Sequence, residues 1–254
     1  MTEDDSDRYR APALDKGLDI LELLARTDGG LTQVEIAKAL GKSPNEFYRM
    51  LDRLVRRGYV QRQDGDRFTL TLKMFGLAHF HQPVRRLVSF AAPMMRDFSA
   101  KAQQACHLAV YDRGSVVVIA QQDSSTYWAL SIRVGAQMSL FNTGSGHVLL
   151  AFQNETQREL MIAEQLRGEE KELPANLRER LQQVKAQGYE SMNSLQTAGV
   201  RNISAPILLL DGTALAVVTC PFIGSLNEAA PKEDDCLKLI RETAKAISEV
   251  VAGQ

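Results

Sequence analysis

The 254-residue sequence has few of the residues that build covalent, metal-bound or membrane-spanning frameworks. Its three cysteines (Cys106, Cys220 and Cys236) are odd in number and lack Cys-x-x-Cys spacing, which excludes a disulfide scaffold and favours a reducing, cytoplasmic location. Four scattered histidines without metal-ligand spacing beside a carboxylate predict no metal and no other cofactor. Because no apolar run reaches membrane length and the amino end is acidic, we expect neither a membrane span nor a signal peptide.

Charge is divided unevenly along the chain, although the formal total is only −1. Lysine and arginine outnumber acidic residues between residues 8 and 80, and the remainder is net acidic. The hydrophobic content of 44% is that of an ordinary globular protein of one or two domains. Segregated charge of this kind indicates one domain that faces nucleic acid and one that does not.

A short stretch in the basic part predicts two capped helices separated by a tight turn. Thr32 and Glu35 have capping-box spacing, so a helix should begin there and run to about Leu40. After a glycine-containing turn, Ser43 is a favourable N-cap and Pro44 lies at the first helical position, where its missing N–H costs nothing. This arrangement is typical of a helix-turn-helix.

The second of these helices has one apolar and one polar face, and a hairpin follows it. Its apolar residues recur at spacings of three and four: Phe47, Met50, Leu51, Leu54 and Val55. Residues 59–63 and 67–72 predict two strands joined by Asp64-Gly65-Asp66. A helix-turn-helix with a two-stranded wing is a module that reads double-stranded DNA.

The polar face supplies the candidate DNA contacts. Asn45 and Arg49 should reach base edges, with Glu46 and Tyr48 as further candidates, because Asn and Arg bond adenine and guanine edges in pairs. Contacts that set the register, mostly to phosphates, are expected from Thr32, Gln33, Lys42, Ser43, Arg53, Arg57, Arg62 and Arg67. Asp52 would repel DNA and should instead pair with Arg49 or Arg56 in its own helix. The alternative is that these arginines form only a solvated helix face.

The remainder of the chain predicts a longer helix followed by an α+β sandwich. A helix at 13–26 precedes the module, and helices at 74–81, stopped by Pro83, and 84–104 follow it. Strands are expected at 107–111, 116–121, 129–134, 201–209 and 214–220, and further helices after 143, at 155–165, at 174–187 and from about Pro231. These elements predict a five- or six-stranded antiparallel sheet with helices on its faces.

A glycine-rich helix start in this second half is the candidate small-molecule site. Gly144, Ser145 and Gly146 open a helix whose amide N–H groups and dipole favour an anion such as a carboxylate. Hydrogen bonds or apolar walls are expected from Asn202, Ser204, Thr219, Met138 and Leu140. The alternatives are a tight glycine turn into a buried helix, exposed polar strand residues and ordinary core residues.

A second class of function remains open at this point. A small-molecule enzyme or redox sensor would act through Cys106 or Cys220. Cys106 and His107 make a poor catalytic dyad, because neighbouring strand residues point to opposite faces of a sheet. A third possibility is an architectural DNA-binding protein without an effector.

The order of these features resembles the IclR family of bacterial transcription regulators, from about Ala13 to Val251. The resemblance rests on "ALDKGLDILELLARTDGGLTQVEIAKALGKS" and "FYRMLDRLVRRGYV" in the first half. In the second half it rests on "RVGAQMSLFNTGSGHVLLAF", "GYESMNSLQTAGVRNISAPIL" and "DGTALAVVTCP". The sequence departs from the family at Gly146-His147, where "GK" is usual, at 191–194, where acidic residues are common, and at Asn202, where Cys is common.

The resemblance implies a homodimer, or a dimer of dimers, that binds a palindromic operator. It also implies a GAF-like second domain that binds a small effector, often an organic or aromatic acid, in a regulator that is not an enzyme. The expected organisation is a disordered tip at 1–11, a winged helix-turn-helix domain at 12–73, a linker helix at 74–83 and an effector and oligomerisation domain at 84–254.

Overall fold

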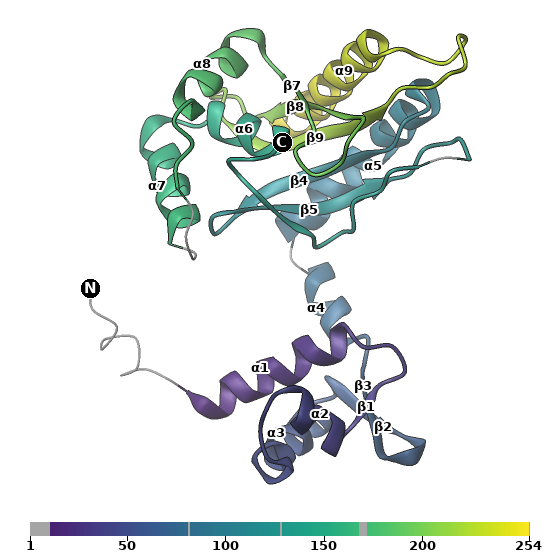
Figure 1. The fold of residues 1–254 in the computed structure, drawn as a ribbon, viewed down its shortest axis with the longest axis vertical. Helices are drawn as coiled ribbons and strands as arrows, with labels where there is room; N and C mark the ends of the chain where they lie inside the picture. Colours follow the sequence, from purple (N-terminus) through teal and green to yellow (C-terminus); the bar gives the residue numbers. More distant parts are fainter. Residues whose placement is uncertain (1–10, 81, 128, 168–171, 254) are drawn as a thin grey trace. The chain divides into compact units, whose positions relative to one another are not determined.

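The computed structural model describes residues 11–80, 82–127, 129–167 and 172–253. The chain divides into two compact units at the Gln82–Pro83 bond, and each unit is described by itself (Figure 1). Most of the expected disordered tip, residues 1–10, lies outside the described residues. Within the described ranges, no helix is both long enough and apolar enough to cross a membrane.

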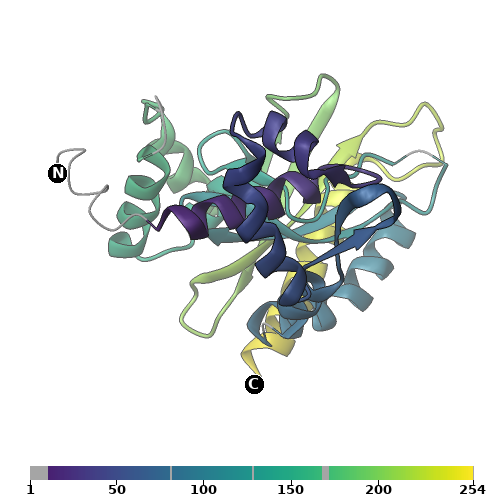
Figure 2. The same ribbon diagram turned by 90° about the horizontal axis from the view of Figure 1, so that it is seen from below.

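The first unit is a winged helix-turn-helix. Its helices and strands are α1 Pro12–Ala25, β1 Leu31–Thr32, α2 Gln33–Ala39, α3 Pro44–Arg56, β2 Val60–Gln63, β3 Arg67–Leu70 and α4 Lys73–Phe80. The three strands form an antiparallel sheet in the order β1-β3-β2. Viewed from below, the purple helices lie beside the blue hairpin of the wing (Figure 2). The core between them is apolar: Ile20, Leu24, Ile36, Phe47 and Leu51 are all buried.

The helix starts of this unit follow from their capping residues. Thr32 Oγ1 accepts from the Glu35 N–H at 3.3 Å, and the Glu35 carboxylate accepts from the Thr32 N–H at 2.8 Å. Ser43 is the N-cap of α3 and Pro44 is its first residue. Both predicted helix starts are therefore confirmed. At each start, capping side chains bond N–H groups that have no partner inside the helix.

The second unit is an α+β sandwich built on a six-stranded antiparallel sheet. The strand order is β6-β5-β4-β9-β8-β7, which brings the first and last parts of the unit together at β4 and β9. The strands are β4 Cys106–Asp112, β5 Ser115–Gln122, β6 Gln137–Ser139, β7 Glu190–Asn193, β8 Val200–Leu208 and β9 Ala214–Ile223. The predicted fold class, including six strands, is confirmed.

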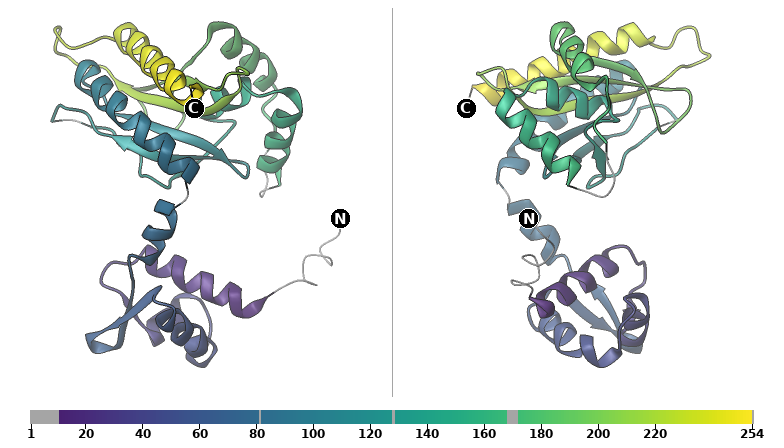
Figure 3. Two further views of the ribbon diagram at one scale, coloured as in Figure 1. Left: turned by 180° about the vertical axis from the view of Figure 1, so that it is seen from behind. Right: turned by 60° about the vertical axis from the view of Figure 1, so that its left-hand side comes forward.

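Helices cover both faces of this sheet (Figure 3). On one face, α5 Gln82–Ala102 and α9 Glu233–Ala252 pack on an apolar core that includes Met95, Phe98, Leu108 and Ile240. On the other face lie α6 Gly144–Ala151, α7 Glu155–Leu166 and α8 Leu177–Gln187, around a second core. All eight residues of α6 are buried, because it lies between the sheet and the outer helices.

One sequence-based strand assignment was wrong. The predicted strand at 129–134 is irregular, and the chain pairs with β5 after this segment, where the Gly135 N–H donates to the Val118 carbonyl at 2.7 Å and β6 begins. The predicted helix at 74–81 is confirmed as α4, which ends at Phe80, and Pro83 lies in the first turn of the next helix, α5, where no intrahelical N–H is needed. The short strands β6 and β7 were missed because their polar sequences lack an alternating apolar pattern.

We expect Gly146→Ala to destabilise the second unit by about 1–3 kcal/mol, because overpacking forces backbone to move. A Cβ at residue 146 would lie 2.3 Å from the carbonyl oxygen and 2.4 Å from the Cα of Leu140. Gly17→Ala in α1, where a Cβ meets nothing within 4 Å, is the control and should be stabilising. Urea unfolding followed by circular dichroism measures both; an unchanged Gly146→Ala protein would contradict the packing of α6 described above.

Candidate DNA-binding surface and effector site

The polar face of α3 presents the residues expected to read bases. Asn45, Tyr48, Arg49 and Arg53 are all exposed. Tyr48 is 63% exposed. Their side chains therefore reach solvent from the face opposite the buried Phe47 and Leu51.

Asp52, the acidic residue of α3 that was expected to pair within its helix, does so. Asp52 pairs with Arg56 one turn further along α3, with 2.8 Å between Oδ2 and Nε. The prediction that Asp52 is neutralised within its helix is confirmed. This ion pair leaves Arg49 and Arg53 as the cations of the exposed face nearest the start of α3.

Glu46, a candidate for base contact, is engaged at the start of α3 instead. Its carboxylate accepts hydrogen bonds from Lys16 Nζ at 2.8 Å, from the Ser43 N–H at 3.2 Å and from Ser43 Oγ at 3.1 Å. The hydrogen bond from Lys16, followed by those from Ser43, lowers the pKa of Glu46 to about 2. Glu46 and Ser43 thus fix the angle at which α3 leaves the turn and tie it to α1.

Two of the expected DNA-contact residues hold the wing in place. Arg67 donates to the carbonyls of Gly29 at 3.2 Å and Gly30 at 2.8 Å, and it lies 3.3 Å from the carboxylate of Glu35. Arg62 pairs with Asp66 at 2.6 Å across the hairpin. Phosphate contact by these two arginines would compete with the internal bonds.

Two further expected contacts lie on the first motif helix. Gln33 Nε2 donates to the carbonyl of Pro44 at 2.9 Å, which links the start of α2 to the start of α3. Thr32 caps α2 with its hydroxyl. The expected phosphate contacts that remain fully on the surface are Lys42, Arg53 and Arg57.

A row of polar side chains crosses the sheet of the second unit beneath α6. The register aligns His107 with Gln121 on one side and with Thr219 on the other. Thr219 is aligned with Ser204, and Ser204 with Glu190. Directly opposed residues of paired strands point to the same face, so these five side chains form one row, named the polar row from here on.

The hydroxyls expected at the effector site do meet there. Ser145, in the first turn of α6, lies 2.9 Å from Thr219 Oγ1, and Thr219 donates to Ser204 Oγ at 2.8 Å. Gly144 lies so close to this group that a Cβ on it would come within 2.8 Å of Ser204 Oγ and 3.6 Å of the Cβ of Asn202. Asn202, Ser204 and Thr219 therefore lie together, as the alternation of strand residues predicted.

The remaining expected residues contribute packing. Gly146 is pressed against the backbone of Leu140, and its N–H donates to the capping Thr143 Oγ1 at 3.1 Å. That N–H is not available to an anion, so the expected role of Gly146 in ligand binding is replaced by a packing role. The Leu140 side chain lies in the core, and Met138 is half-buried on β6.

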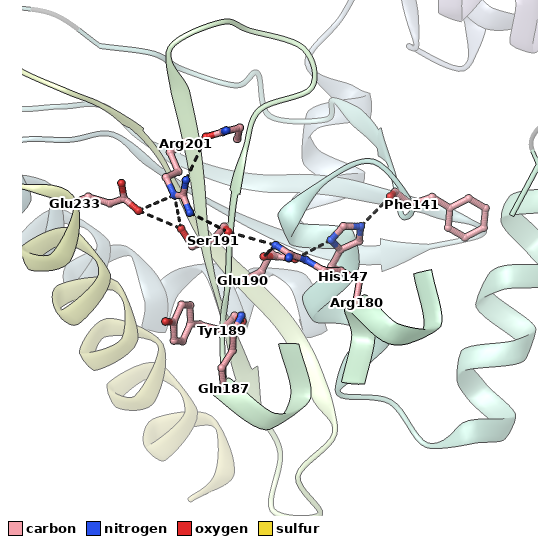
Figure 4. Close-up of polar contacts among 10 residues, drawn as sticks. Phe141, His147, Arg180, Gln187, Tyr189, Glu190, Ser191, Arg201 and Glu233 are labelled. Atoms are coloured by element: carbon pink, nitrogen blue, oxygen red, sulfur yellow. Dashed lines mark hydrogen bonds and ion pairs between the residues drawn. The ribbon is translucent and has the colours of Figure 1, made fainter. Parts of the chain in front are cut away.

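A buried ionic network, which the sequence did not reveal, closes one end of the polar row (Figure 4). Glu190 is completely buried and accepts two hydrogen bonds from Arg180 of α8, one of them at 2.8 Å from Nε. His147 of α6 bridges two segments: its Nδ1 lies 2.9 Å from the Glu190 carboxylate and its Nε2 lies 2.8 Å from the Phe141 carbonyl oxygen.

Electrostatics explain why this carboxylate is tolerated inside the unit. Burial opposes ionisation of Glu190, but the hydrogen bonds and charges of His147 and Arg180 outweigh it and lower the pKa of the carboxyl group. The sequence marked His147 as unusual, since Gly146-His147 departs from the usual "GK" pair. The role of His147 could not be predicted, because its partner Glu190 is 43 residues away in the chain.

Comparison with known proteins assigns both units. The model of the IclR helix-turn-helix domain matches residues 13–64, and the model of the bacterial transcriptional regulator IclR C-terminal domain matches residues 83–249. The chain belongs to the IclR family. It is a DNA-binding transcriptional regulator, not an enzyme.

Relatives and solved structures agree with this assignment. The transcriptional regulator BhcR of Paracoccus denitrificans is 31% identical over 213 residues, covering 82% of this chain and 76% of BhcR. The regulator KdgR of Escherichia coli is 28% identical over 219 residues, covering 84% and 83%. An IclR homologue from Microbacterium hydrocarbonoxydans, solved with 4-hydroxybenzoate, has a TM-score of 0.77 at 21% identity and covers 95% of this chain and 100% of that chain.

The thiols of this IclR-family regulator are unsuited to the alternative of an enzyme or redox sensor. Cys106 of β4, Cys220 of β9 and Cys236 of α9 are all buried in the core between the sheet and the helices α5 and α9. Desolvation raises the pKa of Cys106 to about 12, that of Cys236 to about 11, and that of Cys220 well above its usual value. Reactive cysteines need the thiolate, so buried thiols of this kind are inert.

His107 belongs to the opposite face of the sheet and to the polar row. It is 1% exposed, and within the described chain both of its ring nitrogens are without a hydrogen-bond partner. Desolvation lowers the pKa of His107 to about 4, so the ring is neutral near pH 7. Over the described residues, no group of three or more metal-binding side chains surrounds it or lies elsewhere.

We expect His107 to make the protein acid-sensitive. Because the folded state lowers its pKa from 6.5 to about 4, the unfolded state binds the proton first as the pH falls. The stability that is fully present above pH 6.5 is therefore lost towards pH 4, by up to about 3 kcal/mol for this group alone.

The measurement is the free energy of unfolding at pH 7 and pH 4.5 for the wild type and His107→Phe. The variant should lose less stability between the two pH values than the wild type. Equal losses would contradict a neutral, desolvated His107.

Proposed function

We propose that this regulator binds an inverted-repeat operator as a homodimer or a dimer of dimers, under the control of a small organic acid held at the polar row. The observation that carries the proposal is the pairing of two surfaces in one chain: the exposed face of α3, with Asn45 and Arg49, and the buried polar row beneath α6. The first is suited to base edges and the second to a small polar ligand.

Two features of the first unit support sequence-specific reading. Asn45 and Arg49 lie in the first half of α3, the part of a recognition helix that reaches base edges. Lys42, Arg53 and Arg57 are exposed around them and supply charge for phosphates. The base contact is assigned to Asn45, Arg49 and Tyr48, with Glu46 in a supporting role.

The apolar surface of α1 and α4 supports association of two copies. Leu72, just before α4, and Leu77 and Phe80 of α4 are 82%, 50% and 75% exposed, and Leu14 and Leu18 of α1 are 61% and 47% exposed. Exposed apolar side chains on these helices favour contact with another protein surface. A second copy would also double the few base pairs that one winged unit reads, which accounts for a palindromic operator.

Chemistry and a structural relative support the acid. The IclR homologue of similar fold was solved with 4-hydroxybenzoate, a carboxylate. In this chain, the positive end of the α6 dipole favours an anion near Ser145, which lies in the first turn of that helix.

Control of DNA binding would work by a shift between conformations. An effector that prefers one arrangement of the second units changes the population of that arrangement, and α4 and α5 connect each of them covalently to its DNA-binding unit. The spacing of the two α3 helices on the operator is the quantity that this shift would alter.

The experiment that tests the proposed function recovers genomic DNA fragments of the host that bind the purified protein and sequences them. We expect enrichment of an inverted repeat whose half-sites lie on one face of the duplex. Recovery of random fragments alone, with and without added organic acids, would contradict sequence-specific regulation.

Substitutions on α3 separate base reading from phosphate contact on the recovered operator. Arg49→Ala should cost roughly 1–3 kcal/mol of binding free energy and relax one base position. Lys42→Ala should weaken all sequences alike and reduce the salt dependence. The double variant Asp52→Ala/Arg56→Ala is the control, because it removes both partners of one ion pair and leaves the net charge of α3 unchanged.

Fluorescence anisotropy with operator and mutated operator at several salt concentrations distinguishes these results. Equal losses for Arg49→Ala and for the double variant Asp52→Ala/Arg56→Ala would argue against base reading by Arg49.

A further inference from the structure

The unpartnered ring of His107 requires a physical explanation. In the described part of the chain, neither ring nitrogen of this 1%-exposed side chain has a hydrogen-bond partner. Buried polar groups are almost always bonded, since leaving one without a partner is costly. Such a residue is retained where something other than the stability of the free protein requires it.

The position of His107 links it to the start of α6. It lies in β4 between Gln121 of β5 and Thr219 of β9 in the polar row. The hydroxyl of Thr219 lies 2.9 Å from that of Ser145, in the first turn of α6. His107 is thus one strand removed from the hydroxyls at the helix start, about 5 Å away across the sheet.

Charge along the polar row differs between its two ends. Arg180 and His147 are both bonded to Glu190 at the β7 end. His107, at the β4 position, is neutral and is followed by the uncharged Gln121. A neutral imidazole offers one donor and one acceptor. The acceptor nitrogen needs a donor, which a carboxylate lacks and a hydroxyl group of the ligand supplies.

We propose that His107 is the specificity-determining residue of the effector site and binds a hydroxyl group of the effector, which is therefore a hydroxy acid. This inference rests on the proposed function, which places an organic acid at the polar row. The carboxylate of the ligand faces the first turn of α6 near Ser145, and its hydroxyl faces His107.

The test uses pairs of acids that differ by one hydroxyl group: 4-hydroxybenzoate with benzoate, and lactate with propionate. Dissociation constants are measured by calorimetry on the full-length wild type, His107→Leu and His107→Asn. Thr243→Val, in α9 on the other face of the sheet, is the control for a buried polar substitution.

For at least one pair we expect the wild type and Thr243→Val to bind the hydroxy acid about tenfold more tightly than its partner. His107→Leu should bind both members equally and weakly, with a midpoint of thermal unfolding equal to or above that of the wild type. His107→Asn, which keeps a donor and an acceptor, should restore part of the preference.

Other outcomes overturn the inference in separable ways. A preference that survives in His107→Leu, or a wild type that binds both members of each pair equally, would remove the role of His107 and leave acid binding intact. A lower melting temperature for unliganded His107→Leu would indicate a structural role satisfied by ordered water. Binding of none of the acids would overturn the acid class as well, while operator selection would still test DNA regulation.

Discussion

The arrangement of the second unit depends on one buried carboxylate. Glu190 is completely enclosed, and an ionised group in that position is stable only with close partners. Its partners are Arg180 of α8 and His147 of α6. His147 also contacts the Phe141 carbonyl just before α6. The network therefore joins α6 and α8, which cover the same face of the sheet, to β7 at the edge of that sheet. It also fixes the start of α6 over the polar row, where the ligand is proposed to bind.

The first unit solves a comparable problem with exposed groups. Glu46 and Arg67 form internal hydrogen bonds that orient α3 and the wing. Asp52 forms an ion pair with Arg56 within α3. These internally bonded charges hold the helices and the wing in place, and Arg49 and Arg53 remain exposed on the surface of α3. A DNA-reading helix needs this division, because a side chain can select a base only if its backbone is held still.

The sequence predicted elements with local signals and missed those defined by distant partners. Thr32 and Ser43 marked two helix starts, since capping depends on residues three positions apart. Alternating apolar residues located β4, β5, β8 and β9. The short strand at Glu190–Asn193 and its ionic network depend on pairing with β8, α6 and α8, which no local pattern encodes. Strand alternation, which is a local pattern, grouped Ser204 and Thr219 correctly. His107 was considered only as a partner for Cys106.

The central claim is that the effector occupies the polar row. A crystal structure of the protein purified from its host and grown with a metabolite extract of that host tests it directly. The account predicts ligand density within hydrogen-bonding distance of both His107 and Ser145. Density instead in the surface groove beside α9, lined by Gly188, Leu237 and Arg241, or a polar row filled only by water in a protein that responds to the extract, would contradict it.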